Sequence, residues 1–95
     1  MKVVLTRCGG TREGETNVTG CYPPLGLAYL AAVLQKQGVD VTIIDAEVLG
    51  LGHDQLLERI PSDVTLIGFS ATTLAWPSTR LAAERVKKAF PDALL

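Results

Sequence analysis

The 95-residue sequence lacks most of the residue patterns that identify a catalytic or nucleic-acid-binding chain. It has one histidine, and its two cysteines form no CxxC pair, so neither metal-ligand spacing nor a Ser–His–Asp set can be assembled. Nine basic and ten acidic residues give a net charge of -1 without a basic block, and aromatic residues are limited to two Phe, two Tyr and one Trp. These absences argue against nucleic-acid binding.

Long apolar segments are also missing. No apolar run reaches the ~18 residues that a membrane span needs, and the start, MKVVLTRCGG, is too short for a signal peptide. We therefore expect a cytoplasmic chain with no membrane contact. In that compartment, reduced thiols at Cys8 and Cys21 are favoured over a disulfide.

Phosphate-binding motifs are absent as well. The glycines of RCGGTREGE match neither G-x-G-x-x-G nor G-x-x-x-x-G-K-[ST]. Without that fingerprint, Asp45 is expected to cap a helix or turn rather than bind a ribose hydroxyl. The single histidine, His53, is expected to be an exposed residue at the entry of a helix.

What is present is a regular alternation of strand and helix patterns. A double proline opens one helix and Gly38 ends it, and Leu27, Leu30, Ala31 and Leu34 follow helical spacing. In a later helix, Ala82, Val86, Ala89 and Phe90 are expected to face inward. The expected strands are 2–6, 40–46 and 63–71. The first expected helix begins at 23, and two further helices are expected at 54–60 and 78–90. The segment DALL, at 92–95, is typical of the start of a fourth strand.

This order predicts an α/β fold: a three-layer, doubly wound parallel sheet of the flavodoxin-like or Rossmann-like kind, with strand order 2-1-3 and strands four and five largely missing. In such a sheet a ligand binds beyond the carboxyl ends of strands one and three. The loops there are Arg7–Pro23, which is longer than the ~2–6 residues usual for such a connection, and Ser70–Trp76. The hydroxyls of Ser70, Thr72 and Thr73 either contact a ligand or satisfy backbone groups of the turn.

Three segments resemble a known family: PPLGLAYLAAVLQKQGVDVTIIDAE, DVTLIGFSATT and STRLAAERVKKAFPDALL. They are similar to the N-terminal cobalamin (B12)-binding domain of B12-dependent radical S-adenosylmethionine enzymes. The resemblance implies that residues 1–95 are one partial domain, a fragment of a five-stranded module that holds the corrin. It also implies two groups of cofactor-binding residues: Tyr22, Pro23, Pro24, Leu25 and Gly26 near the corrin, and Ser70, Thr72 and Thr73 at its nucleotide tail.

The sequence departs from related patterns in ways that limit this implication. The Asp-x-His-x-x-Gly loop of other cobalamin domains is missing after strand one, so no histidine of this chain is expected on cobalt. The Gly-Gly-Pro-His-type loop, the fifth strand and the CxxxCxxC iron–sulfur motif are missing too. The resemblance therefore places the 4Fe-4S cluster and S-adenosylmethionine in a downstream domain, with no catalytic or metal-binding residue in this chain.

The resulting interpretation is a cobalamin-binding module that positions a corrinoid for a radical S-adenosylmethionine methyltransferase or cyclase. The alternative is a B12-free structural or substrate-docking module of the same family. A receiver-like signalling domain is disfavoured because strand three ends in GFSATT rather than at an aspartate. The expected partners are cobalamin, the downstream domain and a second copy of the chain. The charge-poor helix after Pro24 would contact the downstream domain. The second copy would pair with the open edge of strand three.

Overall fold

The computed structural model describes residues 1–8 and 23–95. Three parallel strands form one sheet in the order β2-β1-β3. The elements are β1 (Lys2–Arg7), α1 (Leu25–Lys36), β2 (Asp40–Asp45), α2 (Ala46–Leu49), α3 (His53–Arg59), β3 (Leu66–Ser70) and α4 (Trp76–Ala89). The predicted fold class and strand order are confirmed.

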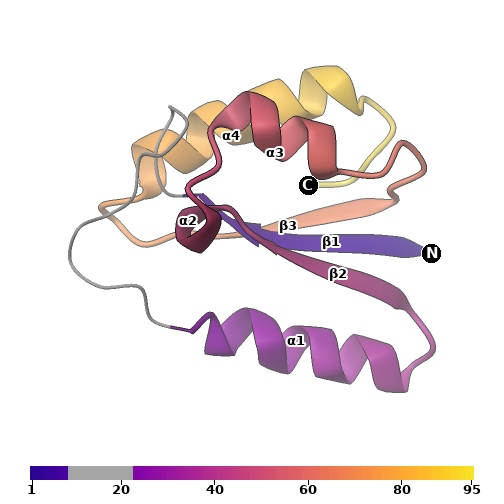
Figure 1. The fold of residues 1–95 in the computed structure, drawn as a ribbon. Helices are drawn as coiled ribbons and strands as arrows, with labels where there is room; N and C mark the ends of the chain where they lie inside the picture. The colour runs from indigo at the N-terminus through magenta and orange to yellow at the C-terminus, as the bar shows by residue number, and fades with distance from the viewer. Residues whose placement is uncertain (9–22) are drawn as a thin grey trace.

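The helices form a layer on each face of this sheet (Figure 1). Helix α1 covers one face, and α3 and α4 lie together on the other, while the short α2 follows β2 at the carboxyl end of the sheet. Because a parallel crossover is right-handed, the connections from β1 to β2 and from β2 to β3 must place their helices on opposite faces when β1 is central. The three-layer arrangement follows from the strand order.

Alternate strand residues pack on opposite sides of the sheet into two apolar clusters. The smaller cluster joins Val3 and Leu5 to Leu27 and Ala31 of α1. The larger one lies under α3 and α4, and its buried members are Val4, Cys8, Ile44, Ala46, Leu51, Leu56, Ile60, Val64, Ile67, Ala82, Val86 and Ala93. The β1 side chains thus contribute to both clusters, which explains why the three consecutive residues Val3, Val4 and Leu5 are all apolar.

The end of the chain forms one isolated bridge to β3, within the segment that the sequence predicted as the start of a fourth strand. Leu94 forms a parallel bridge to Leu66 on the edge of β3 that is remote from β1. Its N–H donates to the Thr65 carbonyl at 3.0 Å, and its carbonyl accepts from the Ile67 N–H at 2.8 Å. Strand order therefore continues past β3, and the part of β3 beyond this bridge has no neighbouring strand on that side among the described residues.

Several predicted boundaries shift by a few residues. Strand β3 begins at Leu66 because residues 61–64 form a turn in which the Val64 N–H donates to the Pro61 carbonyl at 3.2 Å. Helix α1 begins at Leu25, with Pro24 as its N-cap, and α4 begins at Trp76, earlier than expected. The helix α2 was not predicted at all, because four residues carry no measurable periodicity.

Two residues with helical spacing turned out not to be buried. Leu30 is 56% exposed and Ala89 is exposed, whereas Leu27, Ala31, Ala82 and Val86 are buried as expected. At about 100° per residue, Leu30 lies beside the buried stripe of α1 rather than within it. The outward side of α1 is apolar, since Leu25, Tyr29, Leu30 and Val33 are all more than half exposed.

The open edge of β3 leads to a prediction about association. An unpaired strand edge is a template for pairing with another chain. We expect the 95-residue chain to self-associate in sedimentation experiments at high concentration. Phe69 pairs with Thr6 of β1 but lies beyond the Leu94 bridge on the other side of β3. Replacing Phe69 by proline removes a backbone donor and should shift the equilibrium toward monomer. A strictly monomeric parent chain would contradict the prediction.

No described helix has the length and apolarity that a membrane crossing requires.

Candidate functional site

The candidate site lies at the carboxyl edge of the sheet, where the three strands end side by side. Arg7, the last residue of β1, is in register with Asp45 of β2 on one side and Ser70 of β3 on the other. Helix α1, the next element after β1, lies on one face of the sheet, whereas α4, which follows β3, lies on the other (Figure 1). Doubly wound sheets bind their ligands at the carboxyl edge, where the helices after two adjacent strands lie on opposite faces in this way.

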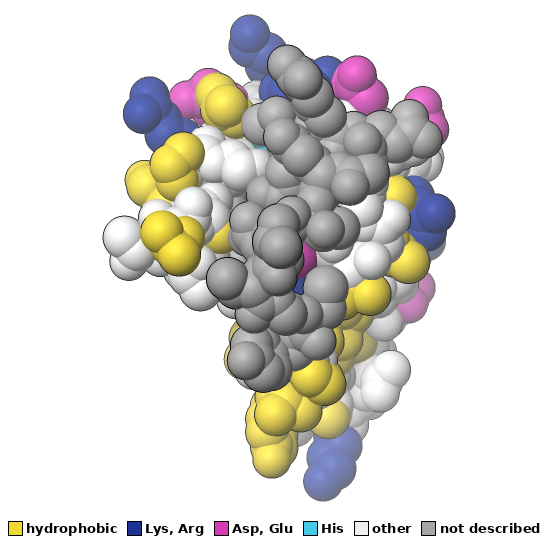
Figure 2. Space-filling view, turned by 60° about the vertical axis from the view of Figure 1, so that its left-hand side comes forward, with side chains coloured by type: hydrophobic (Ala, Val, Ile, Leu, Met, Phe, Trp, Pro, Cys, Tyr) yellow, Lys and Arg dark blue, Asp and Glu magenta, His cyan; other side chains and the backbone are white. Residues whose placement is uncertain are grey.

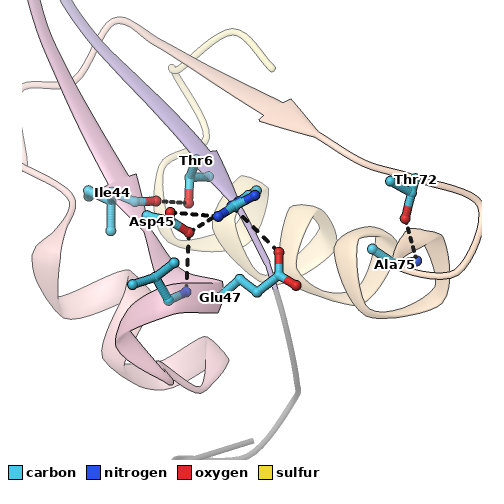
Figure 3. Close-up of polar contacts among 8 residues, drawn as sticks. Thr6, Ile44, Asp45, Glu47, Thr72 and Ala75 are labelled. Atoms are coloured by element: carbon cyan, nitrogen blue, oxygen red, sulfur yellow. Dashed lines mark hydrogen bonds and ion pairs between the residues drawn. The ribbon is translucent and has the colours of Figure 1, made fainter. Parts of the chain in front are cut away.

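Charged side chains gather at the β1–β2 half of this edge (Figure 3). Arg7 donates from Nε to Asp45 Oδ1 at 2.8 Å and from Nη2 to Asp45 Oδ2 at 2.9 Å, and its Nε lies 3.5 Å from Glu47 Oε2. The three side chains are only 16–17% exposed. A bidentate arginine–carboxylate contact in so sheltered a place fixes both side chains.

Asp45 also caps α2, as the sequence predicted. Its Oδ1 accepts from the Val48 N–H at 3.2 Å, and α2 then ends at Gly50 in the left-handed region with φ 64°. Both carboxylate oxygens of Asp45 are therefore engaged within the protein. These contacts favour the capping role of Asp45 over the ribose-binding role that such a residue has in a dinucleotide fold.

Hydroxyl groups mark the β3 half of the edge. Ser70 ends β3 and is exposed, as are Thr72 and Thr73 in the loop that follows. Thr72 Oγ1 accepts from the Ala75 N–H at 3.3 Å (Figure 3). One lone pair of Thr72 is thus used by the turn, while its hydroxyl hydrogen can still donate outward. Of these three residues, Ser70 is in register with Arg7, and Thr72 and Thr73 follow it in the loop after β3.

The predicted residues before and in α1 lie at the same end of the sheet, on the face that α1 covers (Figure 1). Pro23 and Pro24 precede the helix, and their carbonyls accept from the Leu25 N–H at 2.8 Å and the Ala28 N–H at 2.9 Å. A Cβ built on Gly26 would meet nothing within 4 Å, so no packing within the described chain requires a glycine there. Tyr22, the remaining predicted contact, lies outside the described residues.

A rim of exposed apolar side chains surrounds this edge. Leu74 is 89% exposed and Trp76 57% exposed at the entry to α4, and Val48 and Leu49 of α2 are about half exposed. With Leu25 at the start of α1, each of the three segments that border the edge presents a large apolar group to solvent. Figure 2 shows hydrophobic side chains gathered in separate groups on this side of the molecule.

His53 differs from its prediction. The imidazole is only 4% exposed, and its Nε2 lies 3.1 Å from Ser78 Oγ at the start of α4. The helix-entry position was correct, because α3 begins at His53, but the exposure was wrong. The side chain turns inward since α3 and α4 pack together, and a hydroxyl on α4 provides a partner that the sequence spacing did not reveal.

Two residues of this edge, and Gly68 in the interior of β3, were missed by sequence reasoning. Arg7 and Glu47 are ordinary charged residues whose contact depends on strand register, and no sequence pattern identifies it. Gly68 lies in β3, where a Cβ would come within 2.8 Å of Leu5 Cδ2. Its glycine therefore lets Leu5 pack close to the strand, a requirement that a glycine inside a strand pattern does suggest.

Cys8, just after β1, is buried rather than reactive. It is 2% exposed, and desolvation raises the pKa of the thiol to about 11. The described residues contain no group of three or more His, Cys, Asp or Glu side chains placed to hold a metal ion. Cys8 is accordingly a core residue beneath the site.

The raised pKa of Cys8 predicts how stability depends on pH. The unfolded thiol ionises near its ordinary value of 9.0, and the folded thiol only near 11, so the folded state binds the proton more tightly. The contribution of Cys8 to the free energy of unfolding should therefore be fully present below pH 9 and be lost as pH rises toward 11. Urea titrations of the chain and of its Cys8→Ala variant measure this, and an equal alkaline decline in both would contradict it.

Comparison with known proteins decides the family. A family model described as "B12 binding domain" matches residues 15–95, most of the chain. The chain belongs to the B12-binding domain family. No solved structure matches the chain.

Curated proteins from three organisms contain a segment similar to this chain. An anaerobic magnesium-protoporphyrin IX monomethyl ester cyclase from Cereibacter sphaeroides is 34% identical over 89 residues, covering 86% of this chain and 14% of that protein. Cyclases of the same name from Rubrivivax gelatinosus and Synechocystis are each 32% identical, and the match covers 84% and 77% of this chain and 15% of each of those proteins. The B12-binding chain thus spans about one seventh of the length of these relatives.

Proposed function

We propose that this chain binds cobalamin at the carboxyl edge of its sheet and holds the corrin in place for chemistry carried out by another domain. The observation that carries the proposal is the agreement between the matched family and the position of the predicted residues. Pro24 and Leu25 stand at the start of α1, and Ser70 and Thr72 stand at and after the end of β3, which is the end of the strands where doubly wound sheets bind ligands.

The residues at this edge fit a cobalamin. A corrin is a large, flat ring with an apolar surface and polar amide side chains, and it requires apolar contacts with hydrogen-bonding groups around them. The exposed Leu25, Leu74 and Trp76 supply the apolar contacts. The hydroxyls of Ser70 and Thr72 supply donors for the nucleotide tail, which carries a phosphate and amide oxygens.

The described chain offers no histidine positioned as a lower ligand of cobalt. His53 is the only histidine of the sequence, and it is buried against Ser78. Binding would therefore rest on ring contacts and on the tail rather than on a protein–cobalt bond. Cobalamin supplies methyl-transfer or radical chemistry when it is bound, and this chain supplies its orientation and the exclusion of water beneath it.

The resemblance to B12-dependent radical S-adenosylmethionine enzymes extends the proposal to the parent protein. We place this chain beside a radical S-adenosylmethionine domain with a 4Fe-4S cluster, in an enzyme of the methyltransferase or cyclase type. The cyclase relatives support the second type, because they are named for that activity and match most of this chain. The apolar outer side of α1 is the surface that would contact the downstream domain.

A titration with hydroxocobalamin followed by visible absorbance tests the binding. The 95-residue chain is titrated beside a chimera in which it is joined to the segment that follows the matched region in the Cereibacter sphaeroides relative. We expect a saturable spectral shift, stronger in the chimera because it completes the sheet. Saturable binding by neither would contradict the proposal and favour the alternative, a B12-free structural or substrate-docking module.

A matched pair of variants locates the binding. Ser70→Leu places a larger side chain at the β3 end of the edge, whereas Ser62→Leu makes the same change at an exposed position on the turn before β3, at the opposite end of the sheet. We expect Ser70→Leu to raise the dissociation constant by about tenfold or more, which is about 1.4 kcal/mol, and Ser62→Leu to leave it unchanged. Equal effects of the two variants would show that binding does not use this edge.

A further inference from the structure

The loop between β3 and α4, residues 71–75, exposes some of its side chains to solvent, while its last residue is buried and hydrogen-bonded. Thr72, Thr73 and Leu74 are exposed, the last of them by 89%. Ala75, in contrast, is only 9% exposed. A short loop at a sheet edge has few apolar contacts that could order it. Its conformation therefore depends on specific hydrogen bonds, which we call anchors.

The first anchor is a set of hydrogen bonds to the backbone of Ala75. Its N–H donates to Thr72 Oγ1 at 3.3 Å. Its carbonyl accepts from the Thr79 N–H at 2.9 Å and from Thr79 Oγ1 at 2.8 Å. Thr79 is only 2% exposed, so its hydroxyl makes this hydrogen bond from a buried position. Both polar groups of one peptide residue are thereby fixed at the point where the loop becomes helix.

The second anchor comes from a different helix. His53, 4% exposed at the start of α3, lies within hydrogen-bond distance of Ser78 in the first turn of α4, with Nε2 3.1 Å from Oγ. Ser78 directly precedes Thr79. The first turn of α4 is therefore tied both to its own loop and to α3, and neither His53 nor Thr79 reaches the exposed side of the loop.

We propose that Thr79 and His53 are positioning residues for the ligand-binding loop. They hold residues 71–75 in the bound conformation before the ligand arrives, without touching it. This inference rests on the proposed cobalamin site. A loop that is already ordered loses less conformational entropy on binding, so removing its anchors should weaken affinity even though every contact group remains present.

Thr79 provides the sharper test because valine has nearly the same shape without the hydroxyl. We expect Thr79→Val to raise the dissociation constant for hydroxocobalamin about three- to tenfold, the range that corresponds to one hydrogen bond, and Thr79→Ser to restore affinity close to that of the parent. Val86→Ala is the matched control, since Val86 is a 1% exposed core residue of the same helix, and its loss lowers stability without altering the loop.

The other anchor is tested through its partner. Ser78→Ala removes the hydroxyl beside His53 and should also raise the dissociation constant for hydroxocobalamin about three- to tenfold. The double variant with His53→Leu should bind no more weakly than Ser78→Ala alone. Wild-type affinity in both Thr79→Val and Ser78→Ala would overturn the proposal. So would a loss of affinity in Val86→Ala as large as that in Thr79→Val, because the effect would then follow stability alone.

A measurement without ligand separates this inference from the proposed function. Trp76, the only tryptophan, adjoins the loop and is 57% exposed. We expect its fluorescence anisotropy in the ligand-free chain to fall in Thr79→Val and Ser78→Ala but not in Val86→Ala. That result supports the anchoring role even if the parent chain binds no cobalamin, whereas unchanged anisotropy in both anchor variants contradicts it.

Discussion

Replacing Arg7 by methionine is expected to destabilise this chain more than any other change to a charged residue. The guanidinium is the shared partner of Asp45 and Glu47, and all three side chains are 16–17% exposed. Its removal leaves two carboxylates facing each other in a sheltered place. Breaking a fully buried pair costs about 3–5 kcal/mol, and partial exposure reduces this to about 2–4 kcal/mol here.

The measurement is the free energy of unfolding from urea titration, with Arg80→Met as the matched control. Arg80 pairs with Glu84 on the surface of α4, where the side chains are 68% and 56% exposed. Its replacement should change stability by no more than about 0.5 kcal/mol. If the two arginine variants lose the same stability, the Arg7 contact is an ordinary surface ion pair and does not organise the edge of the sheet.

The Arg7 variant also bears on binding. Arg7 stands between the β2 and β3 ends, in register with Asp45 and Ser70, so its loss should loosen the edge that the corrin would cover. Combining Arg7→Met with Asp45→Asn and Glu47→Gln removes the unpaired charges. We expect this triple variant to recover much of the lost stability, because neutral amides cost less than carboxylates to shelter from water.

Leucine-to-alanine substitution at two positions should separate folding from binding. Leu56 is 1% exposed in the larger core cluster, whereas Leu74 is 89% exposed at the rim of the site. Leu56→Ala should cost about 2–5 kcal/mol of stability through lost burial and a cavity. For a chain whose total stability is on the order of 5–10 kcal/mol, this brings unfolding close to ordinary temperatures.

Leu74→Ala should behave in the opposite way. An exposed side chain contributes little to folding, so the free energy of unfolding should stay within about 0.5 kcal/mol of the parent. The dissociation constant for hydroxocobalamin should rise about three- to tenfold, because the leucine loses its contact only in the complex. Thermal unfolding and absorbance titration of both variants test the pair. Unchanged affinity in Leu74→Ala would remove this residue from the proposed rim.

The fold could be predicted from the sequence because the patterns that define its strands and helices are local. Short apolar runs at Lys2–Thr6 and Asp40–Ala46 indicate strands. The helical period of apolar residues indicates the amphipathic helix α4. The right-handed crossover rule then leaves few topologies, and the order 2-1-3 follows. Even the start of a fourth strand was predicted at DALL, which forms one isolated bridge to β3 at Leu94.

The details of the site were not accessible because they depend on register and packing. Whether Arg7 meets Asp45 is decided by the pairing of β1 with β2, and a shift of one residue would send the side chain to the other face. The burial of His53 depends on how α3 packs against α4, which no spacing within one helix reveals. Asp45 was predicted correctly since a cap is again a local feature.

The most direct test of the account is to map bound cobalamin on the sheet by amide chemical shifts. The 15N-labelled chain, or the chimera if it binds more tightly, is titrated with hydroxocobalamin. We expect large shifts at the carboxyl edge, in Arg7, Asp45, Ser70 and Thr72, and small ones at the amino edge, in Lys2, Asp40 and Leu66. Shifts that centre on the amino edge, or saturating ligand without shifts at either edge, would contradict the claim that this edge holds the corrin.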